Sequence, residues 1–283
     1  ITKNSIIVTF GNFYRKSRGL IENLKTKSNI KTINFIDYKK FIKWSEKNKK
    51  NQKKLIFFLE IPSNPFLKVI DIYDIRNRFK NSTIIVDLSF AGIKNDKKLL
   101  NLSDILVISL TKYINGHNDV LGGALLIKDK KIYSKIWEHR STFGGVLETM
   151  SSYLTLRSLK TYDLRINKML LNTQKILNEL KKSENINKIW YPGEFENKNQ
   201  NQRFLKYFTH GGSVITFETK NLNSINLFKK MKTIKMAPSF GSVETLIEWP
   251  YYMSYYSQSK SNLKKLNIKK NLIRLAVGCE DHE

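Results

Sequence analysis

Six short apolar segments, separated by longer amphipathic stretches, are the feature of this sequence that most constrains its fold. They are rich in β-branched residues and lie at 5–9, 32–36, 55–59, 83–87, 105–109 and 124–127. Near-continuous apolar strands of this kind are typical of a parallel sheet covered on both faces. Between two of them, residues 66–80 carry helix-spaced apolar side chains at Val69, Ile72, Ile75 and Phe79. This alternation predicts an α/β fold with a mostly parallel sheet.

The pattern changes after about residue 149. A helical period runs over 151–182, and the sequence Tyr191-Pro192-Gly193 then breaks it. Further strands are predicted at 213–218 and 272–277, with another element at 222–231. We therefore expect a large domain over residues 1–150, followed by a long linking helix and a smaller C-terminal α/β domain over 151–283.

The composition is strongly basic, with 50 Lys and Arg against 24 Asp and Glu and a net charge of +26. Such a charge suggests nucleic-acid binding. However, the lysines are scattered, and no zinc-ligand spacing, basic-aromatic motif or heptad zipper accompanies them. We therefore expect no nucleic-acid partner and no metal site.

The remaining composition indicates a cytoplasmic protein without a membrane partner. The single cysteine, Cys279, fits a reducing compartment. No apolar run reaches the roughly 18–20 residues of a membrane span, and no signal segment opens the chain. The sequence begins at Ile1 directly before an apolar segment, so we expect a cut N-terminus.

Chemically active side chains gather at the ends of predicted strands, where open α/β sheets place their ligands. They occur at 60–65, 87–90 and 109–123, and Arg274 stands in the last apolar strand. A pyridoxal 5′-phosphate (PLP) enzyme acting on amino acids needs a lysine that can lose its charge, an acid at the ring nitrogen, hydroxyls for the phosphate and an arginine for the substrate carboxylate. Lys112, Asp87, Ser109 with Thr111, and Arg274 would supply them.

Each of these residues also has an ordinary explanation. Asp87 could be a turn residue, Lys112 could be a solvated lysine, and Arg274 could pair with Glu280 or Asp281. The residues alone therefore indicate an α/β enzyme with a site near residues 87–123, and no further.

Five segments, taken in order along the chain, resemble those of the Cys/Met-metabolism family of PLP enzymes. Residues 109–123 resemble its lysine signature, and residues 60–65 resemble its E-(S/T)-P-(S/T)-N-P segment. The other three lie at 157–165, 237–245 and 273–281. The resemblance implies the PLP-dependent transferase fold of the aspartate aminotransferase type (fold type I).

The resemblance also implies a role for each matched residue. Lys112 would carry PLP as a Schiff base and move protons, and Tyr14 would stack on the cofactor ring. Asp87 would pair with the ring nitrogen, and Asn64 would lie near the phenolic oxygen. The other implied roles are phosphate binding by Ser109 and Thr111, cofactor binding by Ser89, and binding of the substrate carboxylate by Arg274 with Ser239.

Within the family, residues 14–18, Tyr-Arg-Lys-Ser-Arg, resemble the plant and cyanobacterial type of cystathionine γ-synthase. This resemblance implies γ-replacement between an activated homoserine ester and cysteine, in a homo-oligomer that is a tetramer in the family. The family's N-terminal arm and phosphate-cupping loop have no counterpart in the chain. The alternatives are another family member (a cystathionine β- or γ-lyase, a methionine γ-lyase or a homoserine sulfhydrylase) or a truncated, non-catalytic paralogue.

Smaller departures from the family pattern are Ser158 and Ser242 in place of Gly, Ala276 in place of Ser, and Leu110 in place of Ala. Serine at 158 and 242 should cost little unless the backbone φ is positive there.

Overall fold

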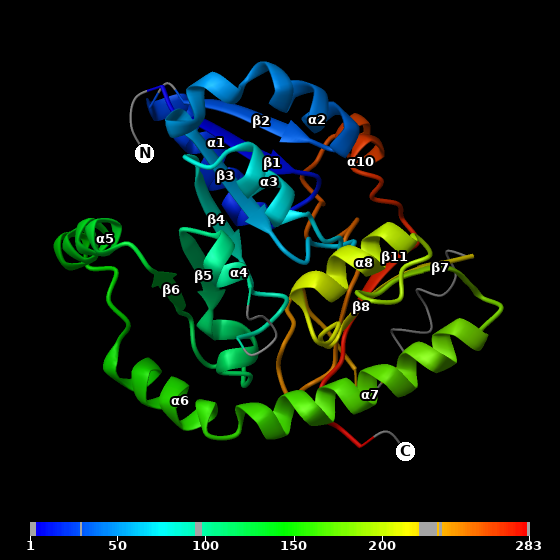
Figure 1. The fold of residues 1–283 in the computed structure, drawn as a ribbon. Helices are drawn as coiled ribbons and strands as arrows, with labels where there is room; N and C mark the ends of the chain where they lie inside the picture. The colour runs from blue at the N-terminus through cyan, green and yellow to red at the C-terminus, as the bar shows by residue number, and fades with distance from the viewer. Residues whose placement is uncertain (1–3, 29, 94–97, 221–230, 232–233, 282–283) are drawn as a thin grey trace.

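The computed structural model describes residues 4–28, 30–93, 98–220, 231 and 234–281, which form two sheets. The first sheet has the strand order β2-β1-β3-β4-β5-β6, and the second has the order β7-β8-β11-β10-β9 (Figure 1). The strands of the first sheet are β1 Ile6–Phe10, β2 Lys31–Phe35, β3 Leu55–Glu60, β4 Thr83–Asp87, β5 Ile105–Ser109 and β6 Gly123–Ile127. Those of the second are β7 Ile186–Trp190, β8 Val214–Thr219, β9 Lys235–Met236, β10 Leu246–Glu248 and β11 Leu272–Ala276.

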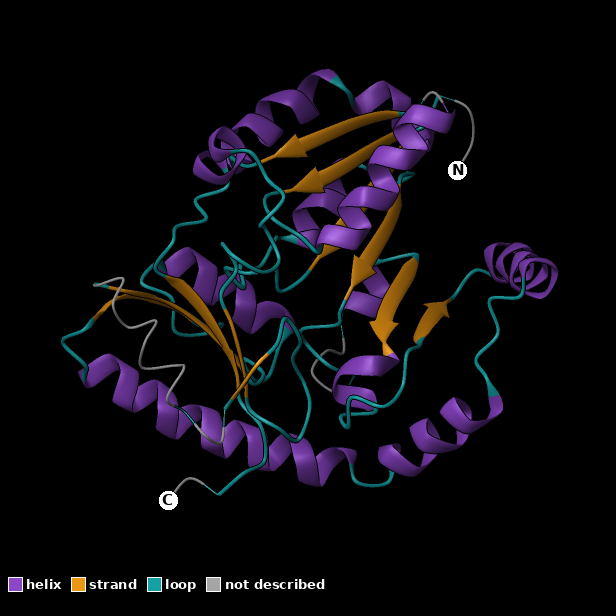
Figure 2. Ribbon diagram, turned by 180° about the vertical axis from the view of Figure 1, so that it is seen from behind, coloured by secondary structure: helices purple, strands orange, loops and turns teal. Residues whose placement is uncertain are grey.

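Helices surround both sheets. They are α1 Arg15–Ser28, α2 Tyr38–Lys47, α3 Ile72–Arg78, α4 Leu99–Leu102, α5 Lys130–Phe143, α6 Thr149–Leu159, α7 Tyr162–Lys182, α8 Lys198–Tyr207 and α10 Lys260–Lys265. Helices α6 and α7 run one after the other beneath the two sheets (Figure 2). The predicted domain boundary at residue 150 falls at the start of α6 and stays a prediction.

The strands predicted in the first half of the chain are present within one residue of their expected ends. Strands β1 to β5 are parallel, as expected, whereas β6 pairs antiparallel with β5, with Ser109 opposite Gly123. The reason is the connection, because residues 110–122 contain no crossover helix that could return the chain to the start of a parallel strand. This connection carries Lys112.

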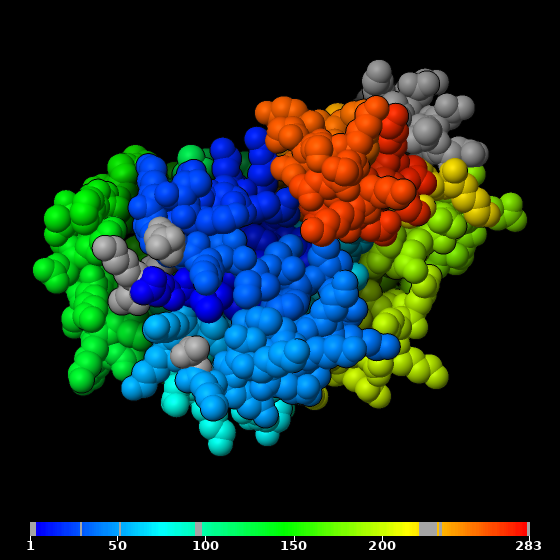
Figure 3. Space-filling model, turned by 90° about the horizontal axis from the view of Figure 1, so that it is seen from above, coloured from blue at the N-terminus to red at the C-terminus, as the bar shows by residue number. Residues whose placement is uncertain are grey.

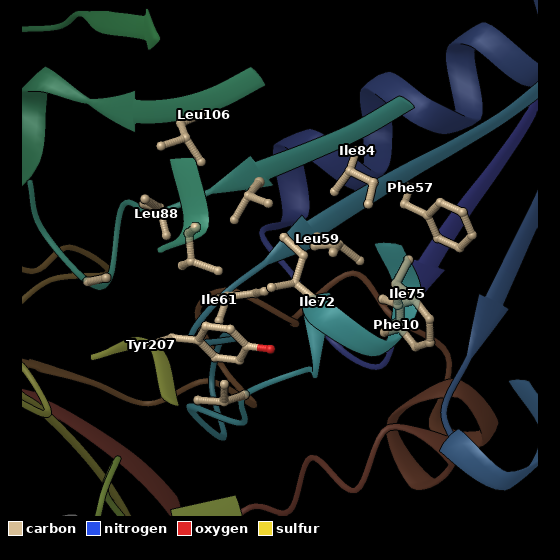
Figure 4. Packing of buried hydrophobic residues seen from close by; sticks show 14 of the residues in the cluster. Phe10, Phe57, Leu59, Ile61, Ile72, Ile75, Ile84, Leu88, Leu106 and Tyr207 are labelled. Atoms are coloured by element: carbon tan, nitrogen blue, oxygen red, sulfur yellow. The ribbon is translucent and has the colours of Figure 1, made fainter. Parts of the chain in front are cut away.

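The main core lies between the central strands and the helices that cover them. Phe57 and Leu59 of β3 and Ile84 of β4 are fully buried, and each such side chain contributes about 1.5–3 kcal/mol by leaving water. Figure 4 shows Leu59 and Ile61 beside Ile72 of α3 and Tyr207 of α8. The helix α8 from the second half of the chain therefore helps to close the core of the first sheet.

Two predicted helices differ from those observed. The expected helix over 66–80 is limited to α3, because Pro65 precedes it and Leu67 has a left-handed φ of 53°. The expected helix over 151–182 is divided into α6 and α7. The carbonyl of Ser158 accepts instead from Thr161 N and Arg165 Nη2, which takes it out of the regular helical ladder. The element expected at 222–231 lies, apart from Met231, outside the described residues.

A segment late in the chain packs on residues near its beginning. Figure 3 shows the segment around residues 255–275 lying against the N-terminal residues. Asn12 Nδ2 donates to the carbonyl of Leu266 at 3.0 Å, across the junction between the two halves. Over the described residues, no helix is long and apolar enough to cross a membrane.

Candidate active site

Lys112 lies in a single π-turn, Leu110–Ile114, directly after β5. Its backbone leaves the helical region, with φ −87° and ψ −130°, and π-turns are frequent at functional sites. Arg165 of α7 fixes the turn, because its guanidinium donates to the carbonyls of Tyr113 and Ile114 at 3.0 Å each. Gly116 has a φ of 72°, and a Cβ there would collide with the Arg165 guanidinium.

The amine of Lys112 is held and electrostatically tuned. Its Nζ donates to Ser239 Oγ at 2.7 Å and lies 5.0 Å from the ring centre of Phe240. Burial and the nearby positive charge of Arg274 lower the pKa of Lys112 to about 8, against an opposing effect of Glu248. An amine with this pKa is partly uncharged near neutral pH, which imine and proton-transfer chemistry requires.

Arg274 lies in the middle of the second sheet, on β11 between β8 and β10. Its Nη1 donates to Asn64 Oδ1 at 2.9 Å, and its Nη2 donates to the Ser239 carbonyl at 3.2 Å. Ser239 therefore bridges Lys112 and Arg274, which come from different sheets.

The ordinary alternative for Arg274, an ion pair with Glu280 or Asp281, is not what the structure shows. Its Nη2 lies 2.6 Å from Glu248 Oε2, whereas Glu280 accepts from Thr245 Oγ1 at 2.7 Å. The pairing with Glu248 follows from the strand register, because Glu248 of β10 lies directly opposite Arg274 of β11. The side chains of Arg274 and Glu248 are 2% and 1% exposed, so the pair is fully buried.

The buried pair leaves hydrogen-bonding capacity free. Among the described residues, neither Arg274 Nε nor Glu248 Oε2 has a hydrogen-bond partner. The 2.6 Å contact is still an ion pair, because Coulomb attraction depends on distance more than on the N–H direction. A buried guanidinium with an orphaned N–H is suited to receive a carboxylate.

Asp87 ends β4 and is buried. Its Oδ1 accepts from the backbone N–H of Ser89 at 2.9 Å, so the residue is also the turn former that the ordinary explanation proposed. Burial raises its pKa, and its hydrogen bonds from Ser89 oppose that rise. A buried carboxylate of this kind would be stabilised by a cationic partner.

The three predicted hydroxyl residues lie along the same edge of the first sheet. Ser89 Oγ accepts from the backbone N–H of Ser109 at 3.2 Å, which places these two serines side by side. Thr111 Oγ1 accepts from Gly122 N at 3.0 Å and so closes the loop that contains Lys112. Thr111 therefore has a structural contact that the sequence did not indicate.

Two acidic residues of the site received no role from the sequence, although Glu60 opens the strand-end cluster at 60–65. Glu60 ends β3 and accepts from the backbone N–H groups of Tyr14, at 2.8 Å, and of Asn64, at 2.7 Å. Glu60 ends a buried strand as Asp87 does, and this signal could have found it. Glu248 stands in an apolar strand, but its pairing with Arg274 depends on a register that the sequence does not reveal.

An open cavity of about 650 Å³ adjoins the lysine. Thr111, Lys112 and Ser239 line it, together with Lys235 and Glu244, which form an ion pair. The other predicted site residues do not line this cavity: Tyr14, Asn64, Asp87, Ser89, Ser109 and Arg274. The ring of Tyr14 is half exposed, and its backbone is attached to the site through Glu60.

The substitutions of Gly by Ser are tolerated for simple reasons. Ser158 lies inside α6, and neither Ser158 nor Ser242 is among the described residues with positive φ. Ser158 Oγ also donates to Asn115 Oδ1 at 3.2 Å. The added Cβ atoms therefore meet no backbone strain.

The chain is also similar to known proteins in sequence and in fold. The chain matches the family described as Cys/Met metabolism PLP-dependent enzyme over residues 1–283. The chain belongs to this family. The family and fold-class predictions are confirmed, since solved structures of the family share the fold over almost the whole chain.

Its relatives differ in activity. The chain is 32% identical to cystathionine γ-synthase 1 of Arabidopsis thaliana over 281 residues, which covers 98% of the chain and 49% of the relative. It is 35% identical to a cystathionine β-lyase of Lactococcus lactis subsp. cremoris over 234 residues, which covers 82% of the chain and 61% of the relative. The structure of cystathionine γ-lyase from Lactobacillus plantarum matches with a TM-score of 0.89 and 27% identity, over 99% of the chain and 74% of that structure. The chain thus spans about half the length of the plant relative.

The residues present fit PLP, the cofactor of this family. Lys112 has the lowered pKa that covalent attachment needs, and Asp87 is a buried acid that a cationic ring nitrogen would stabilise. Ser89 and Ser109 lie together as hydroxyl donors. The Nε of Arg274 has no hydrogen-bond partner among the described residues and so could donate to a carboxylate.

Proposed function

We propose that this chain performs PLP-dependent γ-replacement, joining an activated homoserine ester and cysteine to give cystathionine. The observation that carries the proposal is the bridge through Ser239, which links the amine of Lys112 to the guanidinium of Arg274. This arrangement suits an α-amino-acid substrate, whose amino and carboxylate groups need neighbouring partners. In the reaction, the bond between Cγ and the ester oxygen breaks and a bond between cysteine sulfur and Cγ forms.

The site residues would have separate roles in this reaction. Arg274, held by Asn64, Ser239 and Glu248, would bind the substrate carboxylate and fix its orientation. Lys112, with its pKa near 8, would accept the protons from Cα and Cβ and return them after the thiolate has added. When bound, PLP supplies the electron sink that makes these protons acidic. Asp87 would hold the ring nitrogen, and Tyr14 would cover the ring.

Two features favour γ-synthase among the family's activities. Residues 14–18 resemble the plant and cyanobacterial type, and so does the Pro238-Ser239-Phe240 segment that contacts Lys112 and Arg274. A cystathionine β-lyase is the second candidate, because the Lactococcus relative has the higher identity of the two curated relatives. We further propose a homo-oligomer, as in the family.

Product analysis distinguishes these activities. The PLP-loaded protein is incubated with O-phospho-, O-succinyl- or O-acetylhomoserine, with and without cysteine, and separately with cystathionine alone. We expect cystathionine to appear only when one ester and cysteine are both present. Cleavage of cystathionine alone would instead identify a lyase. Absence of every product, with PLP bound, would favour a non-catalytic paralogue.

A further inference from the structure

We propose that Glu60 is a positioning residue of this site, whose carboxylate ties the chain at Tyr14 to the chain at Asn64 and so sets both side chains for the cofactor. The inference rests on the proposed function, because it takes Tyr14 and Asn64 as cofactor contacts. Glu60 itself touches neither Lys112 nor Arg274 through any hydrogen bond among the described residues, so its role would be indirect.

The position of Glu60 at a strand end is the first support. It is the last residue of β3, is 6% exposed, and lies opposite Asp87 of β4 in the sheet register. Two buried acids thus stand side by side at the carboxyl edge of the sheet. Burial and the charge of Asp87 raise the pKa of Glu60 to about 8, so keeping an acid here has an energetic cost. A residue that only packed in the core would not need to be an acid and would avoid this energetic cost.

The second support is what the carboxylate does. Each oxygen accepts one backbone N–H, and the two donors come from different loops, one after β1 and the other after β3. Glu60 is therefore a clamp between two segments that are 50 residues apart in sequence. A glutamine could accept from only one of them, because its amide nitrogen would face the other N–H.

The third support is the way Asn64 is held. Glu60 fixes its backbone N–H, and Arg274 fixes its side-chain oxygen at 2.9 Å. The hydroxyl of Tyr255 also donates to the Asn64 carbonyl, at 3.4 Å. Release of the clamp would thus disturb Tyr14, Asn64 and, through Asn64, Arg274.

Three variants separate positioning from ordinary folding effects. Above pH 8, where the Glu60 carboxyl is ionised, Glu60→Gln removes the charge and one acceptor. Glu60→Asp keeps the carboxyl, but its shorter side chain cannot reach both N–H groups. The matched control is Glu148→Gln, because Glu148 also accepts from two backbone N–H groups, those of Met150 and Ser151, at the exposed start of α6.

PLP affinity is measured by titration of the visible absorbance that depends on Lys112, and thermal unfolding of each variant is recorded without PLP. At pH 9, where the Glu60 carboxyl is ionised, we expect both Glu60 variants to bind PLP roughly tenfold more weakly or worse, as for a lost charge-assisted hydrogen bond. Glu148→Gln should bind as the wild type does. In hydrogen exchange without PLP, segments 12–16 and 62–66 should exchange faster in the Glu60 variants only.

Each contrary result has a distinct meaning. Wild-type affinity in Glu60→Gln, or full rescue by Glu60→Asp, would overturn the clamp and leave the proposed function standing. Loss of the fold in both variants would also overturn it, because Glu60 would then be a core residue only. Failure of the wild-type protein itself to give Lys112-dependent absorbance would overturn the proposed function, and the inference with it.

Discussion

Strands β3 and β6 have similarly apolar sequences, Leu-Ile-Phe-Phe-Leu-Glu and Gly-Ala-Leu-Leu-Ile, but lie in opposite surroundings. Strand β3 pairs with β1 and β4, and its Leu59 is 1% exposed. Strand β6 pairs with β5 alone among the described strands, and its Leu126 is 41% exposed. The helix that follows, α5, stands away from the sheets in Figure 1, and none of its described residues is buried.

The difference shows what an apolar run can and cannot predict. Such a run predicts a strand, but the helices packed on the sheet decide whether its faces are covered, and its neighbouring strands decide whether its edges are paired. Part of the candidate site is built where cover is complete, since Glu60 and Asp87 end buried strands, whereas Lys112 follows β5 beside the edge strand β6. Several of the exposed apolar side chains lie on β6 and on α5 to α7, among them Leu125, Trp137, Met150, Tyr153, Leu156 and Leu164.

The same substitution in the two strands should have unequal cost. Leu59→Ala should lower the free energy of unfolding by about 2–5 kcal/mol, because it opens a cavity in a packed core. Leu126→Ala should lower it by less than about 1 kcal/mol, because much of that side chain already faces water. Denaturant unfolding of the two variants measures both values. Equal losses would mean that β6 is covered in solution, for instance by another chain.

A smaller effect should appear in the pH dependence of the rate at which Lys112 captures PLP. The folded state lowers the pKa of this amine from 10.5 to about 8, so PLP capture by Lys112 should reach half its maximal rate near pH 8. Between about pH 8 and 10.5 the unfolded chain binds more protons, so the contribution of Lys112 to stability rises with pH across that window. Stopped-flow absorbance over this range measures the midpoint. A midpoint near 10 would show that the lysine is as solvated as a residue on the exposed edge.

The strands and the family were predictable because both depend on local sequence. Buried strands appear as apolar runs, and residues 60–65 and 109–123 resemble family segments directly. What could not be predicted depends on tertiary contacts. The direction of β6 follows from the connection after Lys112, and the break between α6 and α7 follows from the contacts of Arg165 with Ser158 and with the Lys112 turn.

The candidate site, too, could be predicted from the sequence only in part. Lys112, Asp87 and Arg274 could be named from residue type and place. The sequence could not show that Ser239 bridges Lys112 and Arg274, because these three residues lie far apart in the chain. Nor could it show that Arg274 pairs with Glu248 rather than Glu280, since strand register is needed for that. Residue types therefore identified candidates, and the fold determined their partners.

The central claim is that Lys112 is the cofactor lysine. Its most direct test is the visible absorbance of the PLP-treated protein, comparing wild type, Lys112→Ala and, as a control, Lys135→Ala on the exposed helix α5. We predict a protein-bound absorbance band in the wild type and in Lys135→Ala, and its loss in Lys112→Ala. A band of unchanged strength in Lys112→Ala would contradict the account.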